Sequence, residues 1–326
     1  MYNRVVLVTD ELRTLTSADL ARRDLEGNSA EATQLIKSSL EKIAKEVVHY
    51  TDISLFTSNI EKHKHDIIFP IRYGLNSSNS KSLLPAICES SHLMYVGADC
   101  YTHNLCNDKH LSKLYAKEFG INSAKSILVR DYDKNVVLRR LSTLQLPLVV
   151  KPNFGGGSTG ISIHNICSNY QDAANLIAQL IRSHKMPILV EEYIQGYEVE
   201  YIIFGNRQSI RLTEEVKLIM DKQDYFEKTI WGFETKKLDD TTIDFQKSNL
   251  LSENDKGNLQ ALFQSFDKVE FMRIDGRFHN GNFTLIELSP DCYLGDDCAF
   301  YYAFQQQGIK YEDMFRLLIE NAQAPY

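Results

Sequence analysis

The sequence has no apolar run long enough to cross a membrane and no excess of positive charge. A membrane span needs roughly 18 to 20 consecutive apolar residues, and no segment of this chain approaches that length. The formal net charge of -7 disfavours binding to nucleic acids and anionic membranes, because both need clustered Lys and Arg. Only 7 prolines occur, without tracts of biased composition, so little disorder is expected. These absences predict a soluble globular protein with no nucleic acid and no membrane as partner.

Cysteine is present but lacks the spacing of metal or redox sites. The six cysteines include no CxxC pair and stand mostly in apolar or strand-like contexts, which favours free thiols in a reducing compartment. The N-terminal apolar run, residues 5–8, is too short for a signal peptide and predicts a buried first strand. We therefore expect a cytoplasmic protein.

The first third of the chain alternates strand and helix patterns. Helical periodicity covers residues 30–48 and 82–90, and apolar runs predict strands at 5–8, 66–70 and 93–96. This alternation predicts a parallel α/β sheet, whose ligands bind in the loops after the strands. Arg72 lies in one such loop and could bind a substrate carboxylate, although a solvated arginine is the simpler interpretation.

The segment KPNFGGGSTG, residues 151–160, lies between two apolar stretches that predict a strand on either side. The consecutive glycines Gly155, Gly156 and Gly157 permit positive φ angles and allow backbone N–H groups to approach an anion. Ser158 adds a hydroxyl donor, and Lys151 adds a positive charge. This combination suits a polyphosphate. Because the P-loop pattern is absent and the helix-opening context of a GxGxxG motif is absent too, a flexible hairpin turn remains the alternative.

Downstream, ILVEEYIQGYEVEYIIF predicts two strands separated at Gln195 and Gly196. Glu198 and Glu200 alternate with apolar residues and therefore share one face of the sheet. Carboxylates in this arrangement are most often solvated. Binding to a ribose or to a metal is the competing interpretation.

The segment FMRIDGRFHNGNFTLIELSPD predicts a β-hairpin with its turn at residues 280–281. A two-residue turn places Asp275 opposite Ile286, whereas a three-residue loop or an equivalent bulge places it opposite Glu287, with Ser289 further along the same face. Two facing carboxylates need a cation between them, and oxygen ligands suit Mg²⁺. The functional interpretation therefore predicts the second register, and the alternative is a two-residue turn with solvated acids.

Taken in order, these motifs resemble those of D-alanine–D-alanine ligases within the ATP-grasp superfamily, over most of the chain. The resemblance implies an α/β fold, α+β in its C-terminal part, with ATP between two antiparallel sheets. It implies a Rossmann-like domain (1–105), a central subdomain with the glycine loop (106–190) and a C-terminal subdomain with the metal site (191–326). It also implies ATP and two Mg²⁺ ions as cofactors, and a possible homodimer.

By this resemblance, Lys109 and Lys151 match the family's two phosphate-contacting lysines. The hinge that holds adenine matches residues 191–194, and Glu198 matches the ribose-binding acid. The full set of positions implied to bind ATP is Lys109, Lys151, Gly155, Gly156, Gly157, Ser158, Glu191, Glu192, Ile194 and Glu198.

The resemblance also implies catalytic and metal-binding positions. Lys228 is placed like the lysine of the loop that covers the transferred phosphate, and Arg273 matches the arginine that stabilises charged intermediates. Asp275 and Glu287 match two metal ligands. The third ligand of the family is an asparagine, where this chain has Ser289, and a serine hydroxyl is the weaker ligand.

Other departures concern closure and substrate recognition. Gly157 and Thr229 replace a serine and a tyrosine that normally bond to close the active site, so closure must differ. The stretch DCYLGDDCAF, which contains Asp291 and Cys298, replaces a Gly- and Ser-rich segment that binds the second substrate's carboxylate. Its acidity suits a cationic or amino-bearing acceptor. Glu31 is similar to the glutamate that holds the first substrate's ammonium, but it follows an insertion.

The sequence thus predicts an ATP-dependent carboxylate–amine ligase that joins amino acids or similar small molecules through an acyl phosphate. One alternative is D-alanine–D-alanine ligase activity itself. The other is an ATP-binding pseudoenzyme or regulatory module, which the replacement at Ser289 keeps open.

Overall fold

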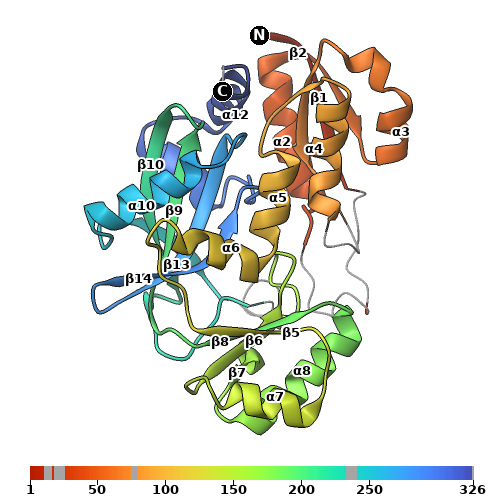
Figure 1. Ribbon diagram of the computed structural model, residues 1–326. Helices are drawn as coiled ribbons and strands as arrows, with labels where there is room; N and C mark the ends of the chain where they lie inside the picture. Colours follow the sequence, from red (N-terminus) through yellow and green to blue (C-terminus); the bar gives the residue numbers. More distant parts are fainter. Residues whose placement is uncertain (11–16, 18–25, 75–78, 233–240, 325–326) are drawn as a thin grey trace.

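The computed structural model describes residues 1–10, 17, 26–74, 79–232 and 241–324, which form three β-sheets with helices packed around them (Figure 1). One sheet is built from the first third of the chain, a second from its middle, and the largest from its last part. The α/β character with antiparallel sheets in the later part agrees with the expected fold class.

The first sheet is parallel, with strand order β2-β1-β3-β4. Its strands and the helices between them are β1 (Tyr2–Thr9), α2 (Ala30–Ile43), β2 (Ala44–Tyr50), α3 (Ile53–Ser58), η1 (Ile60–His63), β3 (Ile67–Ile71), α4 (Ser80–Ser90) and β4 (Met94–Tyr95). The helix predicted over 30–48 is wrong in its second half, because α2 ends at Ile43 and β2 follows directly. Val47 pairs with Val5 of β1, and β-branched residues favour such a pleated, packed surface over another helical turn.

The central sheet is antiparallel, with strand order β5-β8-β6-β7. Its elements are β5 (Ser126–Val129), α7 (Lys134–Leu141), β6 (Leu148–Pro152), η2 (Ile163–Asn165), β7 (Ile166–Cys167), α8 (Tyr170–His184) and β8 (Ile188–Glu192). The strand predicted directly after the glycine loop is wrong: η2 comes first, and β7 has only two residues. The Asn165 amide donates to the carbonyls of Val150 and Gly160 (2.5 and 2.7 Å), which satisfies them without a longer ladder.

The large sheet has the strand order β12-β10-β9-β13-β14, and β11 pairs with β9. Its strands are β9 (Gly196–Gly205), β10 (Ile210–Met220), β11 (Tyr225–Phe226), β12 (Ile243–Lys247), β13 (Phe271–His279) and β14 (Asn282–Ser289). Tyr201 and Met272 share one buried cluster with residues of α5 (Cys100–Asn107), α6 (Lys109–Lys117) and α10 (Glu253–Gln264). Ile202 and Phe271, on the alternate face, share another with α11 (Ala299–Gln306) and α12 (Tyr311–Ala322).

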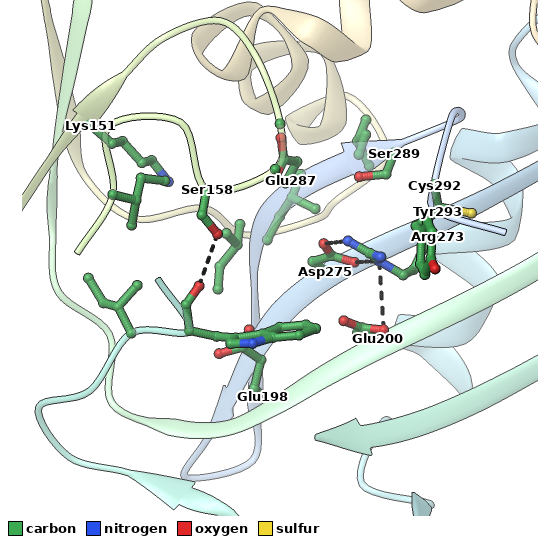
Figure 2. A pocket seen from close by; sticks show the side chains of 18 of the residues that line it. Lys151, Ser158, Glu198, Glu200, Arg273, Asp275, Glu287, Ser289, Cys292 and Tyr293 are labelled. Atoms are coloured by element: carbon green, nitrogen blue, oxygen red, sulfur yellow. Dashed lines mark hydrogen bonds and ion pairs between the residues drawn. The ribbon is translucent and has the colours of Figure 1, made fainter. Parts of the chain in front are cut away.

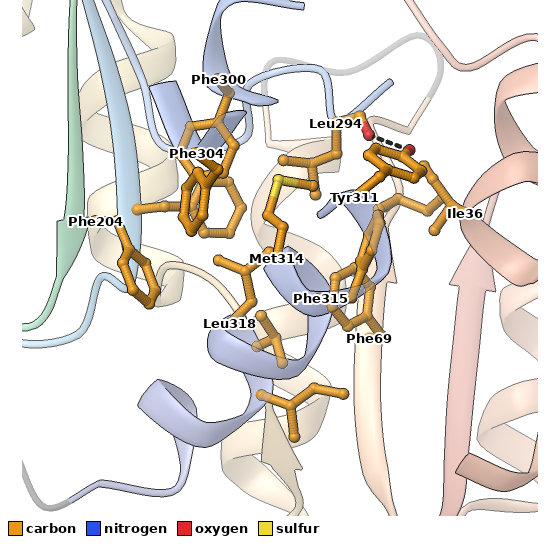
Figure 3. Packing of buried hydrophobic residues seen from close by; sticks show 14 of the residues in the cluster. Ile36, Phe69, Phe204, Leu294, Phe300, Phe304, Tyr311, Met314, Phe315 and Leu318 are labelled. Carbon is orange, nitrogen blue, oxygen red and sulfur yellow. Dashed lines mark hydrogen bonds between the residues drawn. The ribbon is translucent and has the colours of Figure 1, made fainter. Parts of the chain in front are cut away.

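Helix α12 joins the last part of the chain to the first sheet (Figure 3). The ring of Phe315 lies 5.6 Å from that of Phe69 on β3, and the ring of Phe304 on α11 lies 5.2 Å from that of Phe204 on β9. Met314 and Leu318 are fully buried between these layers. This single core therefore fixes how the first sheet stands against the large one.

The β13–β14 hairpin combines a two-residue turn with a bulge. His279 pairs with Asn282, and the register shifts between Asp275 and Gly276, so that Asp275 lies opposite Glu287. The turn residues 280–281 both have positive φ (48 and 77°), as a type I′ turn requires. The register of the functional interpretation is confirmed, and the bulge produces it in place of a three-residue loop.

No helix within the described residues is long and apolar enough to cross a membrane. The six cysteines, all of which lie in the described ranges, are free thiols.

We predict that Gly276→Ala destabilises the fold, because the added Cβ would lie 2.2 Å from the Phe283 ring and 2.8 Å from the Thr284 carbonyl oxygen. The free energy of unfolding, measured with urea, should fall by about 1–3 kcal/mol. Gly257→Ala in α10 is the matched control, because no atom lies within 4 Å of its added Cβ; it should raise stability by roughly 0.5–1 kcal/mol. Equal effects of the two substitutions would contradict the close packing at the bulge.

Candidate functional site

A cavity of about 580 Å³ is lined by residues from all three sheets and their loops. The central sheet contributes Lys151 and Glu191, and the large sheet contributes Glu198, Asp275 and Glu287. The cavity therefore brings together most of the polar residues that the sequence predicted for one site, although they are spread over more than 130 positions of the chain.

The glycine loop closes one side of this cavity and has a defined conformation. Gly155, Gly157 and Ser158 have positive φ (92, 58 and 62°). The Gly156 N–H donates to Glu26 Oε1 (2.8 Å), so the loop already presents backbone donors to an anionic oxygen, as a phosphate-binding loop must. The Ser158 hydroxyl donates to the Trp231 carbonyl (3.4 Å; Figure 2), which joins the loop to the segment after β11.

Three buried lysines converge beside the loop. Lys109, Lys113 and Lys151 are at most 5% exposed. Lys151 Nζ lies 2.5 Å from Glu191 Oε2, and Lys113 pairs with Oε1 of the same carboxylate. Lys109 Nζ lies 3.0 Å from Glu287 Oε1. Three lysines thus face two carboxylates beside the glycine loop, an arrangement that suits a bound polyphosphate.

The pKa values in this cluster follow from burial and from the charges of its members. Burial opposes ionisation of Glu191, but Lys113 and Lys151 outweigh it and lower its pKa to about 2. Burial, together with the positive charge of Lys151, lowers the pKa of Lys113 to about 7 despite its contact with Glu191. The sequence analysis missed Lys113, although its position one helical turn after Lys109 on α6 was a usable signal.

A row of three carboxylates crosses the large sheet at one level. Glu200 on β9 lies opposite Asp275 on β13, and Asp275 lies opposite Glu287 on β14. Arg273 binds Asp275 in a bidentate manner, with both N–O distances 2.7 Å, and its Nε is 3.6 Å from Glu200 (Figure 2). Burial opposes the charge of Arg273, but Asp275 and Glu200 hold its pKa well above the usual range.

The donor set at this row suits a hard cation. Its ligands are carboxylate oxygens from Asp275 and Glu287, with the Ser289 hydroxyl on the neighbouring position opposite Arg273. Within the described ranges, no three His, Cys, Asp or Glu side chains converge closely enough to hold a metal by themselves. Mg²⁺ typically takes one or two carboxylates and completes its shell with waters and substrate phosphates, so these residues fit Mg²⁺ together with a nucleotide.

The hinge after β8 and the start of β9 line the opposite end of the cavity. The Glu192 side chain accepts the N–H of Gln145 (2.9 Å), and Glu192 and Ile194 are both part of the cavity lining. Glu198 also lines the cavity, and its Oε2 lies 2.8 Å from Arg277 NH2. Arg277, which the sequence analysis missed, follows Asp275 by two positions and therefore shares its face.

The end of the cavity near the segment after β14 carries an ion-pair chain. Lys81 of α4 lies 2.7 Å from Glu26 and 2.8 Å from Asp291, so the acidity predicted for this region is partly offset. Cys298 is the N-cap of α11, where its Sγ accepts the N–H of Tyr301 (3.4 Å). Burial raises the pKa of this thiol to about 12, which makes it a neutral part of the wall.

Five predicted site residues are not part of the cavity lining: Lys109, Gly155, Lys228, Arg72 and Glu31. Lys109 and Gly155 lie beside it, because Lys109 donates to the Gly155 carbonyl and pairs with Glu287, which does line the cavity. Lys228 is exposed. Arg72 lies 3.5 Å from Asp10, because parallel pairing of β1 with β3 brings the ends of these strands together. Glu31 is exposed in the first turn of α2, and Glu26, which precedes that helix, lines the cavity instead.

Comparison with known proteins gives one family and many relatives. Residues 116–320 match the family model described as D-ala D-ala ligase C-terminus. A D-alanine–D-alanine ligase from Wigglesworthia glossinidia brevipalpis is 30% identical over 169 residues, which are 51% of this chain and 47% of that protein. Another from Thermotoga petrophila is 22% identical over 297 residues, which cover 90% of this chain and 92% of the relative.

Solved structures agree with the fold. A D-alanine–D-alanine ligase from Bacillus anthracis complexed with ATP has a TM-score of 0.70 at 16% identity, covering 98% of this chain and 97% of its own. A VanG D-Ala:D-Ser ligase from Enterococcus faecalis has a TM-score of 0.68 at 16% identity, covering 98% of this chain and 99% of its own.

We predict that Glu191 contributes to stability only above acidic pH. Because its folded pKa of about 2 lies below the ordinary 4.5, the contribution is complete above pH 4.5 and is lost as the pH falls toward 2. The difference in unfolding free energy between wild type and Glu191→Gln should therefore shrink over that interval in urea titrations. The exposed Glu61→Gln is the control, and a constant difference for Glu191→Gln would refute the buried ion pair.

Proposed function

The chain belongs to the D-alanine–D-alanine ligase family of ATP-grasp ligases, and we propose that it joins an amino-acid-like carboxylate to an amine through an acyl phosphate. The observation that carries this proposal is that one cavity is lined by two buried lysines, Lys113 and Lys151, by Arg273 and by the facing carboxylates of Asp275 and Glu287. A site that only binds a nucleotide does not need an arginine beside its metal-binding carboxylates. A site that transfers a phosphoryl group does need such a cation, because negative charge develops on oxygen during the reaction.

Nucleotide binding is assigned to the lysine cluster and the hinge. Lys109 and Lys151 would contact the phosphates together with the N–H groups of the glycine loop. The hinge at residues 191–194 would hold the adenine and Glu198 the ribose. Lys113 adds a role that the family motifs did not suggest, because it shares Glu191 with Lys151 and so keeps that lysine in place.

The reaction follows in two steps. An oxygen of the substrate carboxylate forms a bond to the γ-phosphorus of ATP, and the bond from that phosphorus to ADP breaks. The amine nitrogen then forms the C–N bond, the C–O bond to phosphate breaks, and the ammonium proton is lost. Negative charge develops on oxygen in both steps, and Lys151 and Arg273 would stabilise it. Lys228 would join them only if its segment moves toward the cavity.

Asp275 and Glu287 would hold Mg²⁺, with Ser289 as a weaker neighbour, and we retain two ions as the proposal. When bound, Mg²⁺ supplies charge neutralisation at the nucleotide phosphates. Arg273 already donates to both carboxylate oxygens of Asp275. Asp275 would therefore have to bind Arg273 and Mg²⁺ at the same time. That arrangement ties the intermediate-stabilising arginine to the metal-binding strand.

The substrates are proposed to be small amino acids or their analogues. The relatives are named for joining D-alanine, which makes D-alanine–D-alanine ligation the second candidate. The acidic segment with Asp291, Asp296 and Asp297 at the acceptor end favours altered substrates, because it would disfavour a free carboxylate, although Lys81 offsets part of its charge. A cytoplasmic location and a homodimer formed through the first sheet complete the proposal, and sedimentation of the purified protein would test the dimer.

The test is ATP-dependent phosphate release against single and paired D- and L-amino acids. Release should require one particular pair and should fall by on the order of 10²-fold or more in Lys151→Ala, because a buried cation at the phosphates is lost. Lys117→Ala on the exposed end of α6 is the control. Release with D-alanine alone would select the second candidate, and binding of ATP without release on any pair would contradict the proposal for these substrates.

A separate prediction concerns the metal. Asp275→Asn should remove the Mg²⁺ dependence of ATP affinity, measured by calorimetry with and without Mg²⁺, because an amide is a poorer ligand for a hard cation. The exposed Asp244→Asn should behave as wild type. If Asp275→Asn retained the full effect of Mg²⁺, Asp275 would not be a ligand.

A further inference from the structure

Arg277 is a buried cation that none of the roles above requires. It lies on β13, is 4% exposed and lines the cavity. A guanidinium so far from water is tolerated only when its hydrogen bonds are largely satisfied by the protein. Its partners therefore show which parts of the molecule it holds together.

The first partner is Glu198, which lies directly opposite Arg277 in the β9–β13 register. The NH2 to Oε2 distance is 2.8 Å, and both side chains line the cavity. This bond engages Oε2 of the carboxylate. The sheet fixes both backbones, so Arg277 sets the orientation in which Glu198 meets a ligand.

Besides the Gly196 carbonyl on β9 (3.4 Å), Arg277 has partners on the segment that carries Lys228. Arg277 donates to the Thr229 carbonyl (3.0 Å) and to the Phe226 carbonyl (3.4 Å), and its guanidinium lies 4.9 Å from the Phe226 ring centre. The Tyr193 hydroxyl accepts the N–H of Thr229 (3.0 Å). Lys228 thus directly precedes Thr229, whose backbone is hydrogen-bonded both to Arg277 of β13 and to Tyr193 of the hinge.

We propose that Arg277 is a positioning residue that couples nucleotide binding at Glu198 to the conformation of the segment bearing Lys228. This inference rests on the proposed function, because it takes Glu198 as the ribose-binding acid. A nucleotide that bonds to Glu198 changes the ion pair with Arg277, and the same guanidinium holds the carbonyls of Phe226 and Thr229. The binding event is therefore transmitted to the segment through one side chain.

The chain provides its own reporter for this coupling. Trp231 is the only tryptophan in the sequence; it lies two residues after Thr229 and lines the cavity. Its fluorescence reports the segment, while calorimetry with ATP or 2′-deoxy-ATP reports binding at the ribose. Neither measurement requires the acid or the amine substrate.

In wild type, ATP should change Trp231 emission, and 2′-deoxy-ATP should bind on the order of 10-fold more weakly, because a hydrogen bond to a charged group is lost. In Arg277→Met, ATP should bind on the order of 10-fold more weakly, with discrimination against 2′-deoxy-ATP reduced at least about threefold. Saturating ATP should then give less than about a third of the wild-type change in emission. Arg277→Lys should restore part of each effect.

Two controls separate positioning from a general loss of structure. Arg211→Met removes an exposed arginine that stacks on Phe204 (5.5 Å) outside the cavity wall, and it should change neither readout. The affinity loss of Glu198→Ala combined with Arg277→Met should be at least about threefold smaller than the product of the single losses, because the two residues act as a unit.

The outcomes distinguish the inference from the proposed function. If Arg277→Met keeps the full emission change and the wild-type discrimination, the coupling is refuted while ATP binding stands. If wild type shows no discrimination and Glu198→Ala leaves ATP affinity unchanged, the ribose assignment fails, and the inference fails with it.

Discussion

The register of β9, β13 and β14 is the constraint on which the site depends. It aligns Glu200, Asp275 and Glu287 in one row, and like charges so arranged destabilise a sheet unless cations compensate them. Arg273 compensates from within the sheet and Lys109 from α6. The bulge after Asp275 creates this strained arrangement, which is why we regard it as a functional feature of the hairpin.

The same principle of charge compensation extends across the cavity. Lys113 and Lys151 share Glu191, Arg277 pairs with Glu198, and Lys81 joins Glu26 to Asp291. Each of these pairs joins different segments, so the cavity is held by ion pairs that connect distant parts of the chain. A polyphosphate and Mg²⁺ would redistribute these pairs without leaving a buried charge uncompensated.

The sequence predicted the parallel first sheet, the strand that precedes the glycine loop, and many of the polar residues that line the cavity. The prediction of a helix over 30–48 failed in its second half, because strand pairing overrode the local pattern. The valines of β2 fit a helical period in the sequence, but in the fold they pair with β1. Lys228, Arg72 and Glu31, which the sequence analysis named as candidates, do not line the cavity in this structure. Lys113 and Arg277 were readable from helix and strand periodicity, but their partners were not.

By itself, the sequence determined the order of motifs and the chemistry available: a glycine loop, lysines, and acids on the two strands of a hairpin. Only the tertiary structure decided the register of the β13–β14 hairpin, since a two-residue turn and a bulge depend on packing of Phe283 and Gly276 that no local pattern specifies. It also decided which charges meet, because ion pairs such as Arg277 with Glu198 form between residues far apart in the chain. Their positions are set by strand pairing and a shared core, which are properties of the whole fold.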